Sequence, residues 1–281
     1  MITVGIIAMG EMGAGVAGRL VQRGARVLTS LAGRSGASAE RAARAGAEAV
    51  DDGVLVGRAD IVLSILPPDR AGALAERLFP TISAAGRKPV FVDCNAIAPE
   101  TLQGIAKPFL AAGLPFVDVG IIGAAPKPDG SGPRFYASGE TERMQILREY
   151  GLDVRPLSAA LGDASALKMA YAGITKGLQA LGSAMAIGAA RAGVAEAFGA
   201  ELRASQPALF AWLTGQLPRM YPKAHRWIGE MEEIARFLAA EPGGSRMLEG
   251  AGALYRAIAQ DWSQGTPAGR IALLDAFAGR A

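Results

Sequence analysis

The hydrophobic positions of the first 160 residues form short apolar runs separated by segments with helical spacing. This alternation is typical of an α/β domain with a doubly wound parallel sheet. The run at residues 61–66, Ile-Val-Leu-Ser-Ile-Leu, is apolar at nearly every position, as a parallel strand buried on both faces requires. The predicted strands are residues 2–7, 25–30, 47–50, 61–66, 90–93, 116–119, 134–138 and 153–156.

Helices are predicted between these strands, and the pattern changes near residue 163. Beyond that point no strand is predicted, and small apolar residues in helical spacing dominate. The second part opens with a long helix over residues 164–191, which ends before Gly193. We therefore expect a boundary near residue 160 and an all-α domain over residues 161–281. In the first part, helices are predicted at residues 12–23, 37–44, 70–78, 99–111 and about 140–150.

Composition indicates a folded protein with few specialised partners. Of the 281 residues, 51% are hydrophobic and 20% are charged, so disorder is not expected. The net charge is +3 and the arginines are scattered, whereas a nucleic-acid partner would favour a basic stripe. We expect no nucleic-acid partner.

The single cysteine and the apolar stretches bear on the compartment. Cys94 alone cannot form an intramolecular disulfide, which favours a reducing environment, and its place at a strand end indicates a small buried residue. Residues 1–7 resemble a first strand rather than a signal peptide, and residues 177–190 are too short to span a bilayer. We expect a soluble, cytoplasmic protein without a membrane partner.

A glycine-containing loop follows the first predicted strand and opens the first helix. In such a loop the glycines permit a tight turn and let the backbone approach a pyrophosphate, which the helix N-terminus attracts. Ala8 replaces the first expected glycine, so an ordinary glycine-rich turn is the alternative. The strand–loop–helix context favours the loop of a Rossmann-type domain, with these cofactor-binding residues: Ala8, Met9, Gly10, Glu11, Met12 and Gly13.

The end of the second predicted strand distinguishes between the two nicotinamide dinucleotides. NAD-binding domains place an acidic residue there to bind the ribose 2′-hydroxyl. Residues 25–39 contain no acidic residue but include Arg34 and Ser35, and Arg41 follows. A guanidinium and a hydroxyl suit a 2′-phosphate. We therefore expect NADP(H) as the cofactor; the alternative is that Arg34 is an ordinary surface residue.

Two lysines stand out on the long helix. Lys168 and Lys176 are the only charged residues within residues 164–190, and their spacing of eight puts them near one face. A lysine removed from water becomes a plausible proton donor or acceptor near neutral pH. The alternative is that the amines reach solvent or pair with a carboxylate. Three polar residues share this face: Thr175, Gln179 and Ser183.

Five segments carry a resemblance to a known family. They are Gly10 to Gly13, Leu66 with Pro67, residues 93–96, residues 118–124, and residues 168–172 after Gly162. On these segments, over about residues 1–190, the chain resembles the β-hydroxyacid dehydrogenase superfamily, which contains 3-hydroxyisobutyrate and 6-phosphogluconate dehydrogenases. It is most similar to a branch with a short helical C-terminal domain of poorly defined function.

The resemblance implies roles for particular residues. It places Leu66, Pro67 and Asn95 by the cofactor and makes Lys168 the catalytic lysine. It also places the substrate by Ile122, Gly123 and Ala172, although Ile122 and Ala172 replace the family's serine and asparagine. Tyr171, Lys176 or residues near His225, Arg226 and Glu230 are then expected to bind a different, less polar substrate.

These observations together predict an NADP(H)-dependent oxidoreductase. It would transfer a hydride between nicotinamide and a hydroxyl or carbonyl carbon of a small, hydroxy-acid-like substrate, with Lys168 as general acid and base. Three alternatives stay open: an imine reductase, a non-catalytic NADPH-binding sensor or scaffold, and a structural helical dimer with a vestigial nucleotide site. We expect a homodimer through the C-terminal helices. No residue cluster has metal-ligand spacing, so no metal is expected.

Overall fold

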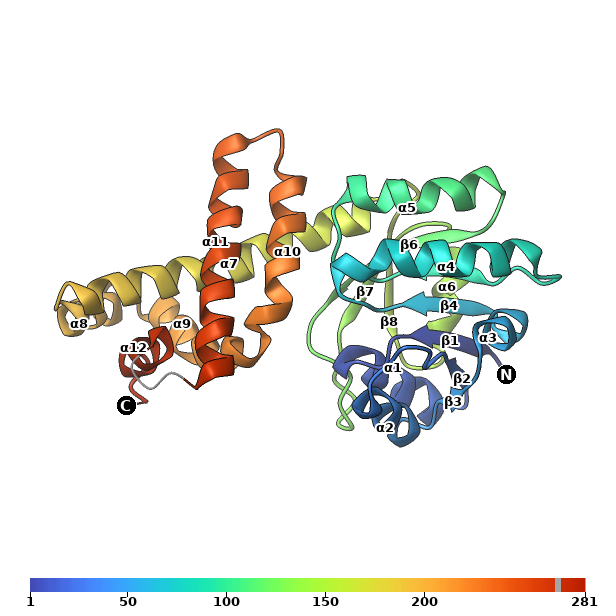
Figure 1. The fold of residues 1–281 in the computed structure, drawn as a ribbon, viewed down its shortest axis with the longest axis horizontal. Helices are drawn as coiled ribbons and strands as arrows, with labels where there is room; N and C mark the ends of the chain where they lie inside the picture. Colours follow the sequence, from blue (N-terminus) through green and yellow to red (C-terminus); the bar gives the residue numbers. More distant parts are fainter. Residues whose placement is uncertain (266–268, 281) are drawn as a thin grey trace. The chain divides into compact units, whose positions relative to one another are not determined.

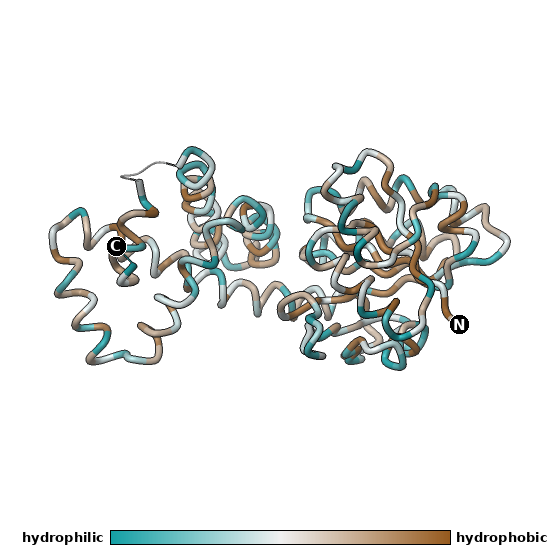
Figure 2. The backbone as a smooth tube through the Cα atoms, turned by 90° about the horizontal axis from the view of Figure 1, so that it is seen from below, coloured by the Kyte–Doolittle hydropathy of each residue, from teal (hydrophilic) through white to brown (hydrophobic). Residues whose placement is uncertain are grey.

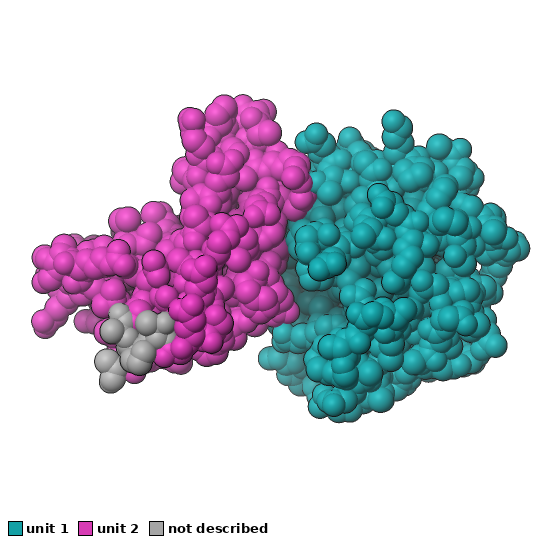
Figure 3. Space-filling view, viewed as in Figure 1, with its two compact units in different colours: residues 1–169 teal, residues 170–281 magenta. Residues whose placement is uncertain are grey.

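The computed structural model describes residues 1–265 and 269–280, which fall into two compact units. The first unit is Met1–Met169 and the second is Ala170–Ala281 (Figure 3). The predicted boundary at residue 160 lies in the connection between the last strand and the long helix. The first turns of that helix, up to Met169, belong to the unit that contains the sheet.

The described residues of the first unit form an eight-stranded, mostly parallel sheet in the order β3-β2-β1-β4-β5-β6-β7-β8. The predicted α/β fold with a doubly wound sheet is confirmed (Figure 1). Each predicted strand is present, with ends that differ by a few residues. The strands are β1 (Thr3–Ile7), β2 (Arg26–Thr29), β3 (Glu48–Ala49), β4 (Ile61–Ser64), β5 (Val90–Asp93), β6 (Phe116–Ile122), β7 (Arg134–Gly139) and β8 (Asp153–Ser158).

The direction of the last two strands differs from the fully parallel prediction. β7 pairs with β6 antiparallel, and β8 pairs with β7 parallel, so both run opposite to the other strands. The physical reason is the connection between β6 and β7. Residues 123–133 contain no helix to carry the chain back across the sheet, and antiparallel neighbours need no such crossover.

Helices cover both faces of the sheet, and one of them was not predicted. Asp51 begins this helix, α3, by accepting a hydrogen bond from Val54 N at 2.7 Å, but two glycines weaken the helical pattern. The predicted helix near residues 140–150 is split into two short pieces. The helices are α1 (Glu11–Gln22), α2 (Gly36–Arg44), α3 (Asp52–Arg58), η1 (Pro68–Arg70), α4 (Ala71–Ala84), α5 (Pro99–Ala111), α6 (Glu142–Gln145) and η2 (Ile146–Arg148).

The sheet has a hydrophobic core on each face. On one face, residues of α1, α2 and α6, such as Leu20 and Met144, pack on alternate strand residues. On the other face, α3, α4 and α5 pack on the remaining ones, with Phe91, Phe109 and Phe116 in mutual contact. Figure 2 shows these strands as the most apolar part of the first unit. Burial on both faces explains why the strands are apolar at successive positions.

The described part of the second unit contains helices and no strand, as predicted. Its long helix α7 spans Asp163–Arg191, and Gly193 just beyond its end has a φ of 75°, which favours glycine. Tyr255 is fully buried and donates a hydrogen bond to Lys176 O at 2.5 Å. No helix within the described ranges is long and apolar enough to cross a membrane. The other helices are α8 (Ala195–Ser205), α9 (Pro207–Met220), η3 (Tyr221–Lys223), α10 (Ala224–Phe237), α11 (Pro242–Gln264) and α12 (Arg270–Phe277).

Candidate cofactor-binding and catalytic site

The loop between β1 and α1 has the geometry of a phosphate-binding turn. Gly10 is the N-cap of α1 and has no side chain to satisfy the N–H groups of the first turn. A Cβ on Gly10 would meet nothing within 4 Å, so its backbone is open to close approach. A Cβ on Gly13 would lie 2.0 Å from Ala8 O, so only glycine permits this packing. The loop thus offers backbone N–H groups and the positive end of a helix dipole to an anion.

The remaining loop residues support the turn rather than face the open side. Met9 is buried, and its carbonyl accepts a hydrogen bond from Arg41 Nε at 2.8 Å. Met12 packs against the core under α1, while Glu11 is exposed in the first helical turn. Ala8 N donates to Ile65 O at 3.3 Å, which ties the loop to the segment after β4.

The end of β2 is rich in cations and hydroxyls. Arg34 is half-buried, and the pKa of its guanidinium is lowered by burial and then by repulsion from Arg77 and Arg70. Ser35 is the exposed N-cap of α2. Ser30 Oγ is buried and has no hydrogen-bond partner among the described residues, which leaves a polar atom at the strand end. These features fit a ligand that brings negative charge and hydrogen-bonding groups to this edge.

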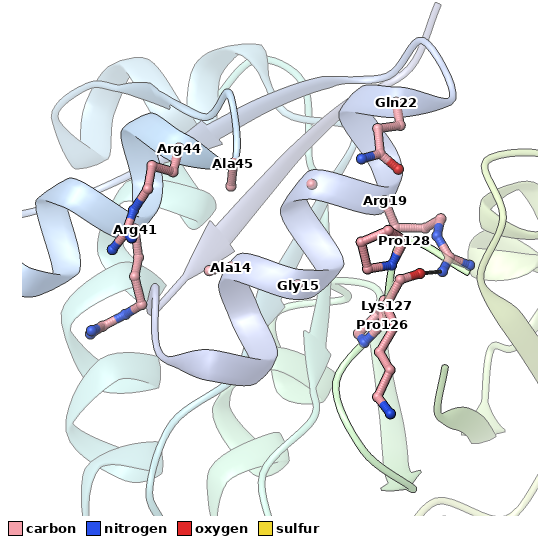
Figure 4. Close-up of a pocket in the computed structure, with 11 residues that line it drawn as sticks. Ala14, Gly15, Arg19, Gln22, Arg41, Arg44, Ala45, Pro126, Lys127 and Pro128 are labelled. Carbon is pink, nitrogen blue, oxygen red and sulfur yellow. Dashed lines mark hydrogen bonds between the residues drawn. The ribbon is translucent and has the colours of Figure 1, made fainter. Parts of the chain in front are cut away.

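The loop between β6 and β7 is fastened to the outer side of α1. Arg19 donates a hydrogen bond to Lys127 O at 2.8 Å (Figure 4). It also donates to Ser131 O at 3.1 Å and to two further carbonyls. Pro126 lies over Gly15, where a Cβ would approach it to 3.1 Å. A cavity of about 290 Å³ lies between this loop, α1 and α2. The loop therefore has a fixed position beside the first helix.

Asn95 and Leu66 are joined in the structure. Asn95 Oδ1 accepts a hydrogen bond from Leu66 N at 2.6 Å, and Asn95 Nδ2 donates to Ser64 Oγ and Asp93 Oδ2. Asn95 is buried, so its amide fixes the backbone after β4, where Pro67 is exposed. The predicted cofactor residues Leu66 and Pro67 are thus linked by a hydrogen bond to the third, Asn95.

A row of buried polar residues crosses the sheet beneath this segment. Ser64, Asp93, Asp118 and Ser138 are consecutive register partners on β4, β5, β6 and β7. Burial, and to a smaller extent the neighbouring Asp118, raise the pKa of Asp93 to about 7 against the opposing effect of hydrogen bonds from Asn95. This row was not predicted as a unit from the sequence. Its signal is a polar residue at the same level in each of four neighbouring strands.

Lys168 is positioned by the start of α7. Its Nζ donates a hydrogen bond to Ile121 O at 2.8 Å. Gly120 permits this contact, because a Cβ there would lie 2.6 Å from Ala164 O and 3.0 Å from Lys168 Cβ. β6 extends past the end of β5, so Ile121 lies beyond the polar row at the carboxyl edge of the sheet. The loop after β1 leaves the sheet at this same edge.

The other predicted substrate residues divide between the two units. Ile122 is buried at the end of β6, and Gly123 has a φ of 126° with Pro133 close by, so it must be glycine. These two join Lys168 in the first unit. The predicted residues Tyr171 and Ala172 lie on α7 in the second unit, the first half-exposed and the second buried.

Lys176 has partners within the second unit. Its ammonium pairs with Glu230 and lies 5.1 Å from the centre of the Trp227 ring. The predicted polar face around it is largely satisfied by the helix backbone: Gln179 donates to Thr175 O, and Ser183 donates to Gln179 O. His225 and Arg226 are exposed residues of α10. Among residues 1–265 and 269–280, no group of three or more His, Cys, Asp or Glu side chains has the arrangement of a metal site.

Comparison with known proteins places this geometry in a family. Residues 3–150 match the family model described as the NAD binding domain of 6-phosphogluconate dehydrogenase, and the chain belongs to this family. Residues 189–258 match a domain of unknown function. The resemblance to β-hydroxyacid dehydrogenases, with a helical C-terminal domain, is confirmed.

Several solved structures share the fold. A conserved protein of unknown function, reported as structurally similar to 3-hydroxyacid dehydrogenases, is 29% identical, with a TM-score of 0.68 over 92% of this chain and 99% of its own. The 3-hydroxyisobutyrate dehydrogenase of Mycobacterium tuberculosis is 16% identical, with a TM-score of 0.66 over 98% and 99%.

An imine reductase from Myxococcus stipitatus also shares the fold. Its complex with NADP+ is 19% identical, with a TM-score of 0.55 over 99% of each chain. A variant of the same enzyme has been solved with NAD+. The fold therefore accommodates both nicotinamide dinucleotides.

The raised pKa of Asp93 predicts a pH-dependent stability. Asp93 titrates near 7 in the folded protein and near 3.8 in the unfolded chain, so the folded state binds this proton more tightly. The contribution of this proton to the free energy of unfolding is present in full below pH 4. It is lost as the pH rises to 7, a decrease of up to about 4 kcal/mol. In Asp93→Asn, the free energy of unfolding, measured with urea across this window, should fall less steeply than in the wild type.

Asp129 provides the control for this measurement. It is exposed in the loop between β6 and β7, and hydrogen bonds from Ser131 lower its pKa. Asp129→Asn should therefore retain the wild-type fall between pH 4 and 7. Equal slopes in Asp93→Asn and the wild type would show that Asp93 does not titrate in this range.

Proposed function

We propose that the protein is an NADP(H)-dependent dehydrogenase or reductase in which Lys168 is the general acid and base. The observation that carries the proposal is the hydrogen bond from Lys168 Nζ to Ile121 O. It lies at the carboxyl edge of the sheet, where the open loop at Gly10 also lies. Parallel sheets bind dinucleotides at this edge, where the strand order reverses between β1 and β4.

The residues present fit a nicotinamide dinucleotide. The first turn of α1 would hold the pyrophosphate, Arg34 and Ser35 would bind the 2′-phosphate, and Leu66 with Pro67 would border the nicotinamide. When bound, the dinucleotide supplies or accepts a hydride. Lys168 Nζ would donate a proton to the substrate oxygen during reduction and remove the hydroxyl proton during oxidation.

The substrate of this reaction is proposed to be a small hydroxy-acid-like compound bound beside β6. It would lie against Ile122 and Gly123, at the end of β6 in the unit that also holds Lys168. Buried Ile122 offers no hydrogen bond, which favours an imine as a second candidate substrate. A panel of keto acids, aldehydes and cyclic imines, followed by NADPH oxidation, distinguishes these substrates, and absence of any turnover with intact NADPH binding would support a sensor or scaffold.

The charge at the end of β2 predicts the nucleotide preference. NADPH should bind more tightly than NADH, because Arg34 attracts the 2′-phosphate and residues 25–39 contain no carboxylate to repel it. Arg34→Asp should weaken NADPH binding by roughly 1.5–3 kcal/mol, the worth of a hydrogen bond to a charged group, and leave NADH affinity less affected. Titration of nucleotide fluorescence measures both affinities.

Arg148 supplies the matched control for charge. It is exposed on η2, which connects β7 and β8 at the opposite side of the sheet from β2. Arg148→Asp changes the net charge equally and should leave both affinities unchanged. Equal wild-type affinity for NADPH and NADH would contradict the proposed preference.

The role of Lys168 predicts a loss of turnover without a loss of binding. Lys168→Met keeps the length of the side chain and removes the proton-exchanging amine. Turnover with the substrate found in the panel should fall roughly 10²–10⁴-fold, while NADPH affinity and thermal stability stay close to those of the wild type. Lys107→Met, at an exposed lysine of α5, should keep full turnover.

Two outcomes would contradict this assignment. If Lys168→Met unfolds the protein, the lysine has a structural role. If turnover is unchanged, the proton comes from another group or from water, and Lys168 is not the acid or base.

We further propose that the protein forms a homodimer through α7. An apolar stripe on this helix is a third to two-thirds exposed in the single chain, and such a contiguous stripe marks an association surface. Its residues recur every three or four positions, as a helix–helix contact requires. They are Tyr171, Ile174, Leu178, Leu181 and Met185.

Substitution within the stripe tests the dimer. Leu181→Glu places a charge in the proposed contact and should convert a dimer into a monomer at micromolar concentration, as measured by light scattering. Leu110→Glu changes a similarly exposed leucine on α5 of the first unit and should leave the dimer intact. A monomeric wild-type protein would refute the proposal.

A further inference from the structure

The start of α7 is held by a strand residue distant in the sequence. Asp118 on β6 accepts hydrogen bonds from Ser165 N at 2.9 Å, Ser165 Oγ at 2.7 Å and Ser138 Oγ at 3.0 Å. Ser138 Oγ in turn accepts from Ala164 N at 3.1 Å. The N–H groups of a first helical turn have no acceptor within the helix. Here β6 and β7 provide those acceptors.

The same strand and helix meet again one turn further on. Lys168 follows Ser165 by three residues, so both side chains lie on one face of α7. Ile121 follows Asp118 by three residues on β6, and its carbonyl accepts the hydrogen bond from Lys168. Gly120, between them, lets the helix lie directly on the strand. The two contacts therefore fix the same register between β6 and α7.

The hydrogen bonds that Asp118 and Ser138 accept from the start of α7, here called the anchor, are also linked to the segment proposed to border the nicotinamide. Asp118 is the register partner of Asp93, which accepts hydrogen bonds from Asn95, and Asn95 holds Leu66 N. The polar row thus connects the backbone after β4 with the helix that carries Lys168. A shift of α7 would change the distance between these two parts of the site.

We propose that Asp118, with Ser165, is the positioning residue for Lys168. It fixes the rotation of the first turns of α7 and their position along β6, and it thereby places Lys168 Nζ at Ile121 O rather than in solvent. An apolar side chain would fill this buried position without the desolvation cost of a carboxylate. The carboxylate is therefore explained by its hydrogen bonds, which orient the start of α7. The inference rests on the proposed role of Lys168, but its test is independent of any substrate.

The test measures the reactivity of the six lysine amines. Competitive acetylation with acetic anhydride, followed by mass spectrometry, gives the rate at Lys168 relative to the exposed Lys107. In the wild type, the hydrogen bond to Ile121 O should make Lys168 the slower of the two. Asp118→Val removes the acceptors of Ser165 N and Ser165 Oγ and should raise the relative rate at Lys168 roughly tenfold or more.

Three variants separate positioning from general destabilisation. Asp118→Asn keeps a carbonyl acceptor for Ser165 N, and the Ser165 hydroxyl rotates to accept from the amide, so Lys168 should remain protected. Ser165→Ala removes one hydrogen bond, should fold, and should raise the rate about fivefold. Val117→Ala destabilises β6 from its opposite, fully buried face and should leave the relative rate at Lys168 unchanged.

The relative acetylation rates at Lys168 in these variants decide for or against the proposal. Protection in Asp118→Asn and Val117→Ala, with acceleration in Ser165→Ala and Asp118→Val, supports the proposal. If Asp118→Val fails to fold, Ser165→Ala carries the comparison. Wild-type protection in Ser165→Ala, or equal acceleration in Val117→Ala, would overturn it. Failure of the proposed function would appear separately, as unchanged turnover in Lys168→Met with the anchor intact.

Discussion

The arrangement of the site depends on satisfying one buried carboxylate. Asp118 lies in the middle of the sheet, where burial raises its pKa and only hydrogen-bond donors offset the cost of removing it from water. β7 supplies one donor through Ser138, and the others come from Ser165 in the first turn of α7 and from Gly162 just before the helix. The need for these donors determines where α7 begins and which of its residues faces β6.

Strand topology then brings the remaining parts together. β1, β4, β5 and β6 are parallel, so the segments after them leave the sheet at one edge. The close approaches at this edge are made by glycines, which is why Gly13 and Gly120 tolerate no side chain. The first unit accordingly contains a dinucleotide loop, the Leu66 segment and Lys168 on a common border.

The sequence predicts those features that a local pattern encodes. Strands buried on both faces are recognised by continuous apolar runs, and α7 by its length. The reversed direction of β7 was not predicted, because hydrophobicity does not encode strand direction. α3 was missed because Gly53 and Gly57 interrupt its pattern. In the proposed site, Lys168 was predicted from its place on an apolar helix and from its motif, whereas the row through Asp93 and Asp118 requires the register of separate strands.

The two lysines of α7 show why a shared helix face does not imply a shared role. Their spacing puts them near one side, yet Lys168 packs on β6 in the first unit and Lys176 pairs with Glu230 of α10 in the second. A charge-assisted pair beside Trp227 accounts for Lys176 as a link between helices. The sheet contact instead places Lys168 at the edge where dinucleotides bind. Tertiary partners, separated by 47 and 54 residues, therefore distinguish two lysines that periodicity alone leaves equal.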